Sequence, residues 1–236
     1  MATLKHFHVE ERPEALLIRL DRPPANAINL DVAREMADVL GTIANGPAGG
    51  AVVITGTGRF FSGGLDLKQV PKYGRDEQRE MIRTINRTAR AIYSLPCPVV
   101  AAVNGHAMAG GLVLALACDV RVATSAPCKL ALTEVNVGIP FPAGPMVIVK
   151  AELPPQAARL LTLTGDALDP ARALALAVVD EIVPPDEVLP RALERAAMLS
   201  ALPGYARIKA QLREVAIAEL ARIVEHDDDP MLREWF

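Results

Sequence analysis

The sequence predicts an α/β fold, in which mostly parallel strands are covered by helices. Three short and largely apolar runs carry this prediction: residues 51–55 (AVVIT), 98–103 (PVVAAV) and 120–124 (VRVAT). Runs of this length without strict polar alternation are typical of strands that are buried on both faces. Stretches with helical periodicity separate these runs, and strands that alternate with helices favour a parallel sheet.

The N-terminal part is expected to begin with two strands. In residues 6–20, Leu16, Ile18 and Leu20 recur at every second position, and an Arg-Pro dipeptide divides the stretch in two. The sequence RPPANAIN then breaks the pattern. From Asp31 apolar residues recur at helical spacing until the sequence NGPAGG ends the helix. A Gly-rich loop, GTGRFFSGGLD, is expected after the strand at 51–55.

A second amphipathic helix is expected over residues 76–95. Met81, Ile85 and Ile92 mark its apolar face, and Pro96 follows its end. After the strand PVVAAV, the sequence LVLALACD is expected to form a buried helix that leads to the strand VRVAT.

The last third of the chain, from about Pro154, is expected to be helical apart from a strand at 178–184. Two Ala/Leu-rich helices carry apolar faces, which are Leu189-Leu193-Ala197 and Ile208-Leu212-Val215. These faces fit packing against a neighbouring subunit and packing on the chain's own domain equally well. The sequence leaves both alternatives open.

Composition excludes several classes of function. The 236 residues carry a formal net charge of −3, and aromatic residues make up 4% of the chain. A negative net charge and few aromatic residues are not expected of a nucleic-acid-binding protein. The start of the chain lacks the pattern of a signal peptide, and no uncharged run is a convincing membrane span. We therefore expect a cytoplasmic protein with neither nucleic acid nor membrane as a partner.

Three cysteines and four histidines give little sign of metal or nucleophilic chemistry. Cys97, Cys118 and Cys128 lie in apolar sequence without metal-ligand spacing, and we expect reduced thiols in the core. Ser62 is not in a G-x-S-x-G elbow, so a hydrolase triad has little support. His106 is interpreted as a structural or pocket-lining residue.

Two Gly-rich junctions, RFFSGGLD and HAMAGGLV, follow predicted strands, and a helix is expected to begin at each of them. The first N–H groups of a helix lack intrahelical acceptors, and glycine allows a ligand to approach the backbone closely. Two such groups can form an oxyanion site for a carbonyl oxygen that gains negative charge. The alternative is that these glycines serve only tight turns and packing. A dinucleotide site fails because Phe61 stands where the third glycine of the fingerprint belongs.

One carboxylate stands out by its isolation. Glu134 lies in KLALTEVNVGIPFPAG, after an apolar run and before a Gly/Pro loop, with no other acidic residue until Glu152. Burial there would raise the pKa of the carboxyl and suit it to act as a base. The alternative is a loop cap or a surface ion pair.

Together these segments resemble the enoyl-CoA hydratase/isomerase (crotonase) family over nearly the whole chain. The sequence RPPANAIN resembles the acyl-CoA entrance motif, FFSGGLDLK and NGHAMAGGLVLALACDVRVA resemble the two oxyanion loops, and LALTEVNVGIPFPAG resembles the segment of the second catalytic glutamate. The resemblance implies a crotonase-type spiral of ββα units in residues 1–185. It also implies a helical region, 186–236, that packs a homotrimer or a hexamer formed from two trimers.

The resemblance also implies the site. The N–H groups of Leu65 and Gly110 would hold a thioester oxygen, and Glu134 would move the proton. Hydratases of the family carry a further glutamate three residues after the second oxyanion glycine, where this chain has Val113. The acyl-CoA substrate would contact a wider set of residues: Arg22, Ala25, Ala27, Ser62, Gly63, Gly64, Asp66, Leu67, Met108, Gly111 and Val113.

The single carboxylate most resembles the pattern of the Δ3,Δ2-enoyl-CoA isomerases, which shift a double bond within the acyl group. No metal and no dissociable cofactor is implied, since CoA is part of the substrate. The alternatives are an enoyl-CoA hydratase, another acyl-CoA enzyme of this fold, and a non-catalytic acyl-CoA-binding protein. Chain length and pathway are not specified by the sequence.

Overall fold

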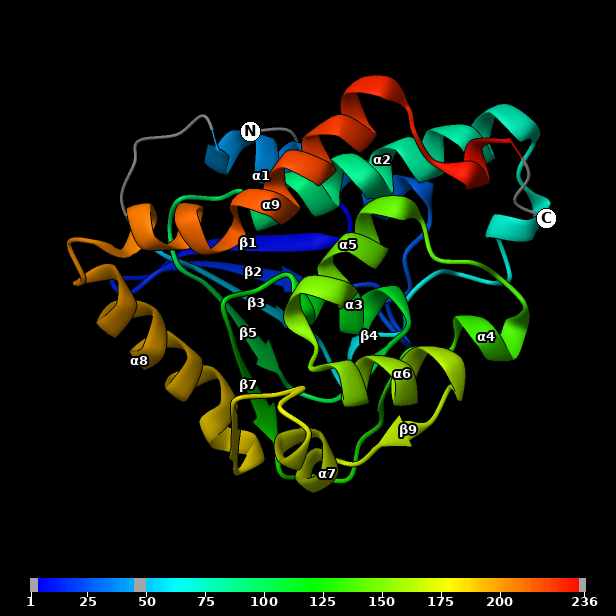
Figure 1. The fold of residues 1–236 in the computed structure, drawn as a ribbon. Coiled ribbons are helices and arrows are strands. Elements are labelled where there is room, and N and C mark those ends of the chain that lie inside the picture. Colours follow the sequence, from blue (N-terminus) through cyan, green and yellow to red (C-terminus); the bar gives the residue numbers. More distant parts are fainter. Residues whose placement is uncertain (1–3, 45–49, 234–236) are drawn as a thin grey trace.

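A six-stranded sheet forms one layer of the computed structural model, which describes residues 4–44 and 50–233 (Figure 1). The strand order is β1-β2-β3-β5-β7-β10; β1 and β2 are antiparallel and the other neighbours are parallel. The predicted strands are confirmed. Their bounds are β1 Phe7–Glu11, β2 Leu16–Leu20, β3 Val52–Gly56, β5 Val99–Val103, β7 Val120–Thr124 and β10 Glu181–Val183.

The central strands are apolar because both faces of the sheet are covered. All five residues of β3 and of β5 are buried. Alternate side chains enter different clusters: Val53 and Val100 pack towards α8 (Val188–Ser200), whereas Ile54 and Ala101 belong to the main core on the other face.

A second, smaller sheet has the order β4-β6-β8-β9. Its strands are β4 Phe60–Ser62, β6 His106–Met108, β8 Leu130–Ala131 and β9 Ala167–Leu168. Three of them were not predicted: β4 and β6 lie inside the two Gly-rich junctions, and β9 lies in a stretch expected to be helical. Strands of two or three residues are too short for a periodic pattern.

Helices cover the sheets (Figure 1). The helices expected from Asp31 and over residues 76–95 are confirmed as α1 and α2, and the buried LVLALACD segment as α3. The bounds are α1 Leu30–Ala44, α2 Arg75–Tyr93, α3 Gly110–Leu116, α4 Glu134–Val137, α5 Ala143–Glu152, α6 Pro155–Leu163 and α7 Pro170–Ala175, with a 3-10 turn, η1, at Val70–Lys72.

The C-terminal segment consists of α8 and α9 (Tyr205–His226), with 3-10 turns η2 Pro185–Glu187 and η3 Pro230–Leu232. The two predicted apolar faces behave differently. Leu189 and Leu193 pack against the sheet of their own chain, whereas Leu212 and Val215 are each 84% exposed. The division at residue 185 and the packing of a trimer stay predictions.

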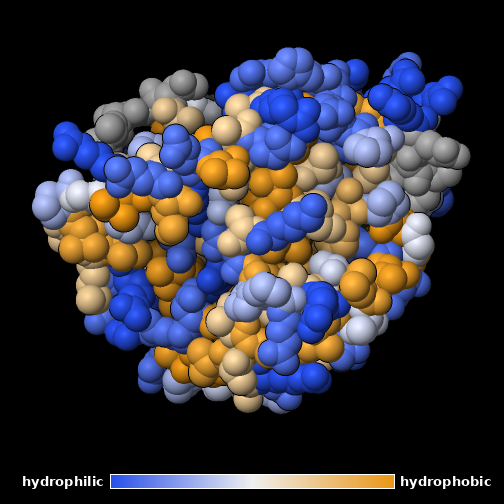
Figure 2. Space-filling model, viewed as in Figure 1, coloured by the Kyte–Doolittle hydropathy of each residue, from blue (hydrophilic) through white to orange (hydrophobic). Residues whose placement is uncertain are grey.

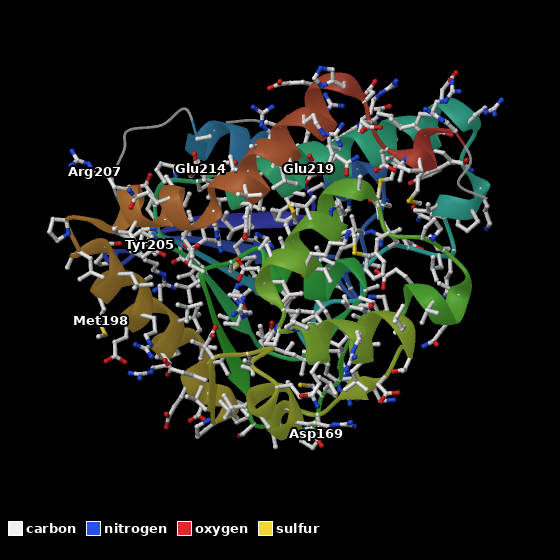
Figure 3. The ribbon with its side chains drawn as sticks, viewed as in Figure 1. Asp169, Met198, Tyr205, Arg207, Glu214 and Glu219 are labelled. Atoms are coloured by element: carbon white, nitrogen blue, oxygen red, sulfur yellow. The ribbon has the colours of Figure 1, made fainter. Side chains whose placement is uncertain are left out.

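The exposed apolar side chains of α9 belong to a wider pattern on one face of the molecule. Hydrophobic surface lies over α8 and the start of α9, at the left of Figure 2. Met198 projects outward from α8, and Arg207 and Glu214 mark the outer side of α9 (Figure 3). The large exposed apolar residues of these two helices and their connection are Met198, Leu202, Ile208, Leu212 and Val215.

A buried cluster of charges fixes α9 to the core. Arg213 contacts Asp119 at 2.9 Å and Glu152 at 3.1 Å, and its guanidinium lies 3.9 Å from the ring centroid of Tyr93. Lys209 contacts Asp119 at 2.8 Å. Each charge in this cluster therefore faces an opposite charge, which buried charges require.

Two features concern the described chain as a whole. None of its helices combines the length and the apolar character needed to cross a membrane. Cys118 and Cys128 are buried free thiols, as predicted, whereas Cys97 is only partly buried.

Candidate active site

An apolar pocket of about 100 Å³ lies between α1, α2, α3 and the segment 139–148. Two polar side chains, Thr88 and Glu134, line it among otherwise apolar groups. Such a pocket suits a hydrocarbon chain next to a few placed polar atoms. Its wall side chains include Met36 of α1, Ile85, Ala89 and Ile92 of α2, Val113, Leu114 and Ala117 of α3, and Phe141, Pro145 and Ile148.

Glu134 is the first residue of α4 and follows the buried strand β8. Its Oε2 atom is buried and has no hydrogen-bond partner among the described residues. Burial, which disfavours the charged form, raises the pKa of this carboxyl to about 7. The expectation of a buried carboxyl with a raised pKa is confirmed, although a hydrogen bond from the residue's own backbone N–H lowers the pKa in part.

Gly110, the first residue of α3, also lines this pocket. As the first helical residue it has an N–H without an intrahelical acceptor. Ala109 before it has a φ of 49° and turns the chain sharply between β6 and the helix. Val113 lies one turn further along α3, is 5% exposed and lines the same pocket.

Leu65 reaches the pocket from the other Gly-rich segment. Leu65 forms a parallel β-bridge with Ile28. In this bridge the Ile28 N–H donates to the Gly64 carbonyl, and the Asp66 N–H donates to the Ile28 carbonyl. The N–H of Leu65 therefore points away from Ile28. The prediction of a helix start at this junction is wrong, because Leu65 forms a β-bridge and is followed only by a turn at residues 67–69 and by η1.

The two Gly-rich segments are packed directly against each other. A Cβ atom at Gly64, where φ is +76°, would lie 2.7 Å from the Met108 carbonyl oxygen and 3.0 Å from the Gly110 nitrogen. A Cβ atom at Gly111 would lie 2.2 Å from the Ser62 carbonyl oxygen. Glycine is required at both positions, and the contact brings the backbone around Leu65 close to that around Gly110.

The remaining predicted contacts form a second group beside the pocket. Arg22 holds Asp66 at 2.7 Å and donates to the Ala27 carbonyl at 3.0 Å. The Gly63 N–H donates to the Ala25 carbonyl at 2.8 Å. These bonds tie the RPPANAIN segment to the first Gly-rich segment.

The predicted site residues therefore fall into two sets. Leu65, Gly110, Val113 and Glu134 line one pocket. The others do not line it: Ser62 is buried and donates to the Asn26 carbonyl at 2.9 Å, and Leu67 is 46% exposed. The residues outside the pocket are Arg22, Ala25, Ala27, Ser62, Gly63, Gly64, Asp66, Leu67, Met108 and Gly111.

Sequence reasoning missed the side chains that form the pocket wall. Thr88 is the most informative, because its Oγ1 atom is buried without a partner among the described residues. It stands between Ile85, Ala89 and Ile92 on the apolar face of α2. A hydroxyl within an otherwise apolar stripe was the signal that could have found it. No metal-ligand group of three His, Cys, Asp or Glu side chains occurs in residues 4–44 and 50–233.

A model of the enoyl-CoA hydratase/isomerase family matches residues 10–231. The chain belongs to this family. YngF of Bacillus subtilis, an enoyl-CoA hydratase/isomerase by name, is 36% identical to this family member over 201 residues, which are 84% of this chain and 75% of YngF.

Solved structures of the family have the same fold. A probable enoyl-CoA hydratase of Mycobacterium tuberculosis has a TM-score of 0.86 at 29% identity, over 94% of each chain. A second structure of the same M. tuberculosis protein, described there as an enoyl-CoA isomerase, has a TM-score of 0.84 at 29% identity, over 93% of this chain and 96% of that one. The crotonase fold predicted for this family member is thus confirmed.

Proposed function

We propose that this enzyme converts a 3-enoyl-CoA thioester into the conjugated 2-enoyl-CoA thioester, with Glu134 as the base and the acid. One observation carries the proposal. Glu134 is the single carboxylate among the described residues that line the pocket, and Val113 occupies the position of the other family glutamate. A single carboxyl is sufficient to move one proton between two carbons of the same molecule.

In the proposed mechanism, the thioester oxygen accepts hydrogen bonds from the N–H groups of Leu65 and Gly110. Glu134 removes a proton from C2, and the electron pair of that C–H bond forms a dienolate whose charge lies on the thioester oxygen. Preorganised backbone donors stabilise such an oxyanion, and each donor contributes about 100- to 1,000-fold in rate.

The second step delivers a proton to a different carbon, after the carboxyl has been able to exchange it with solvent. The Glu134 carboxyl protonates C4, the double bond moves from C3–C4 to C2–C3, and the thioester carbonyl forms again. A pKa of about 7 suits both steps, because the carboxyl accepts and releases the proton near neutral pH. The apolar side chain of Val113 keeps water away from C3, which disfavours hydration.

The CoA moiety is proposed to lie along the joined segments beside the pocket. Arg22, Ala25 and Ala27 form one side, and residues 62–67 form the other; Met108 and Gly111 support the second oxyanion segment. The proposed substrate thus enters past the Arg22–Asp66 ion pair and places its acyl group in the apolar pocket.

A homotrimer or a hexamer of two trimers is the proposed assembly. Its support is the exposed apolar face of α9, since Ile208 is 62% exposed and Leu212 and Val215 are more exposed still. Light scattering coupled to size exclusion measures the mass of the assembly. A monomer in solution would contradict this proposal.

Hydration of a 2-enoyl-CoA is the second candidate, because YngF and the first M. tuberculosis structure carry hydratase in their names. Hydration requires a group that orients water in addition to the group that delivers a proton. Val113 supplies no such group, which is why isomerisation is preferred.

Product analysis separates the candidates. The enzyme is incubated in deuterated water with a 3-enoyl-CoA and, separately, with a 2-enoyl-CoA, while deuterium at C2 and C4 and conjugated absorbance are followed. Isomerisation gives conjugated product and label at C4 or C2. A faster conversion of the 2-enoyl-CoA to a 3-hydroxyacyl-CoA would establish the hydratase instead, and binding without exchange would establish a non-catalytic protein.

A further inference from the structure

The acyl pocket contains a hydroxyl group that the proposed reaction does not use. Thr88 lies on the face of α2 formed by Ile85, Ala89 and Ile92, all of which line the pocket. Its Oγ1 atom is fully buried and has no hydrogen-bond partner in the described part of the chain. A buried hydroxyl without a partner lowers the stability of a protein, so its presence here needs a reason.

Other helical hydroxyls of this protein show what Thr88 does not do. A threonine or serine in a helix commonly donates to the carbonyl four residues earlier. This protein repeats that bond at several positions: Thr42 to Asp38 at 2.9 Å, Thr162 to Ala158 at 2.7 Å and Ser200 to Ala196 at 2.9 Å. Thr88 makes no such bond, and its hydroxyl remains available to a group inside the pocket.

The size of the pocket limits that group. A cavity of about 150 Å³ lined by apolar side chains binds benzene, which has six carbon atoms. The pocket here measures about 100 Å³. A group of a few non-hydrogen atoms, such as a short acyl chain beyond the thioester carbonyl, fits a space of this size.

We propose that Thr88 hydrogen-bonds an oxygen atom carried by the acyl chain, so that the preferred substrates are short acyl-CoA thioesters with a keto or hydroxyl group. This inference rests on the proposed function, because that function places the acyl group in this pocket. A hydroxyl can donate to either oxygen substituent, and the paired hydroxyl no longer lacks a partner. A plain alkyl chain would leave Thr88 buried and unpaired, which weakens its binding.

Binding of two matched thioesters tests the inference without relying on turnover. Pentanoyl-CoA and 4-oxopentanoyl-CoA have the same chain length and differ in one keto oxygen, and neither has a double bond to shift. Calorimetry gives both dissociation constants for the wild type and for the variants Thr88→Val and Thr88→Ser. Thr162→Val is the control, because it removes the same hydroxyl from a helix outside the pocket.

The wild type is expected to bind 4-oxopentanoyl-CoA about tenfold more tightly than pentanoyl-CoA, as one hydrogen bond to a buried group allows. Thr88→Val should abolish this preference, whereas Thr88→Ser and Thr162→Val should keep it. Thr88→Val should also melt at the same temperature as the wild type or higher, because the substitution removes an unpaired buried hydroxyl.

Equal binding of the two thioesters by the wild type, or an unchanged preference in Thr88→Val, overturns the inference. Turnover of 3-pentenoyl-CoA is measured separately on the same proteins. If the wild type prefers the keto thioester but does not turn over 3-pentenoyl-CoA, the isomerase is rejected and the role of Thr88 is kept. If it turns over 3-pentenoyl-CoA but binds both thioesters equally, the isomerase is kept and the role of Thr88 is rejected. Failure to bind either thioester rejects both.

Discussion

The carboxylates beneath α9 and the carboxylate of the pocket lie in opposite surroundings. Beneath α9, Asp119 and Glu152 contact Arg213 and Lys209, and the Tyr93 hydroxyl donates to Glu152 at 2.7 Å. In the pocket, the Oε2 atom of Glu134 has no partner among the described residues.

The difference separates a structural role from a chemical one. A carboxylate that contacts fixed cations has its charge compensated and holds the elements that carry these cations together. A carboxyl that is buried without a cation has a raised pKa and can accept and release a proton, at a cost in stability. The comparison therefore assigns anchoring to the α9 cluster and proton transfer to Glu134.

The largest expected effect is on turnover. Glu134→Gln keeps the shape of the side chain but removes the base, so kcat for 3-enoyl-CoA should fall by about 100- to 10,000-fold. Acyl-CoA binding should be retained, as measured by calorimetry. The matched control is Glu214→Gln on the outer side of α9 (Figure 3), which should leave kcat unchanged. A Glu134→Gln enzyme with wild-type kcat would remove Glu134 from the mechanism.

The next effect concerns the stability provided by the α9 cluster. Arg213→Ala leaves Asp119 and Glu152 with fewer opposite charges in a buried place, which should cost about 3 to 5 kcal/mol. Denaturant unfolding measures the loss. Arg207→Ala removes an exposed arginine from the same helix and should change stability by less than about 0.5 kcal/mol. Similar small losses in both variants would show that the cluster does not anchor α9.

Glu134→Gln should raise the stability of the protein, whereas Arg213→Ala lowers it. Folding raises the pKa of this carboxyl from 4.5 to about 7, so the folded protein loses stability as the pH rises through this range. The variant escapes that loss and should be more stable than the wild type by about 3 kcal/mol at pH 8. Below pH 4.5 the two proteins should unfold alike. A destabilised variant at pH 8 would contradict an unpaired, desolvated Glu134.

The smallest effect is the dependence of the reaction on pH. The free enzyme needs ionised Glu134, so kcat/KM should fall about tenfold per pH unit below about 7 and level off above it. Rates measured from pH 5 to 9 give this profile. A profile that stays flat down to pH 5 would indicate a carboxyl with an ordinary pKa or a different base.

Much of the fold could be predicted from the sequence because its central strands are buried on both faces. Such strands produce unmistakable apolar runs, as at 51–55 and 98–103, and the helix at 76–95 shows a clear apolar stripe. The strands of the smaller sheet have only two or three residues and are stabilised by their neighbours. They therefore leave no pattern of their own.

Less of the site than of the fold could be predicted from local sequence patterns. Glu134 was visible by its isolation, and its loop of Gly and Pro gave a local reason to single it out. The pairing of Leu65 with Gly110 came from the family resemblance, since no local pattern joins residues 45 positions apart. The role of Thr88 depends on which face of α2 lines the pocket and on the lack of a hydrogen-bond partner for its hydroxyl group. Both are properties of the folded chain.

Direct titration of Glu134 tests the central claim most closely. Carbon-13 labelling of glutamate carboxyl groups, with Glu134→Gln to assign the signal, gives the pKa of this residue by NMR. A midpoint near pH 7 is the predicted result. A midpoint near 4.5, the ordinary value for glutamate, would show that the carboxyl is solvated or paired and would contradict its role as the proton carrier.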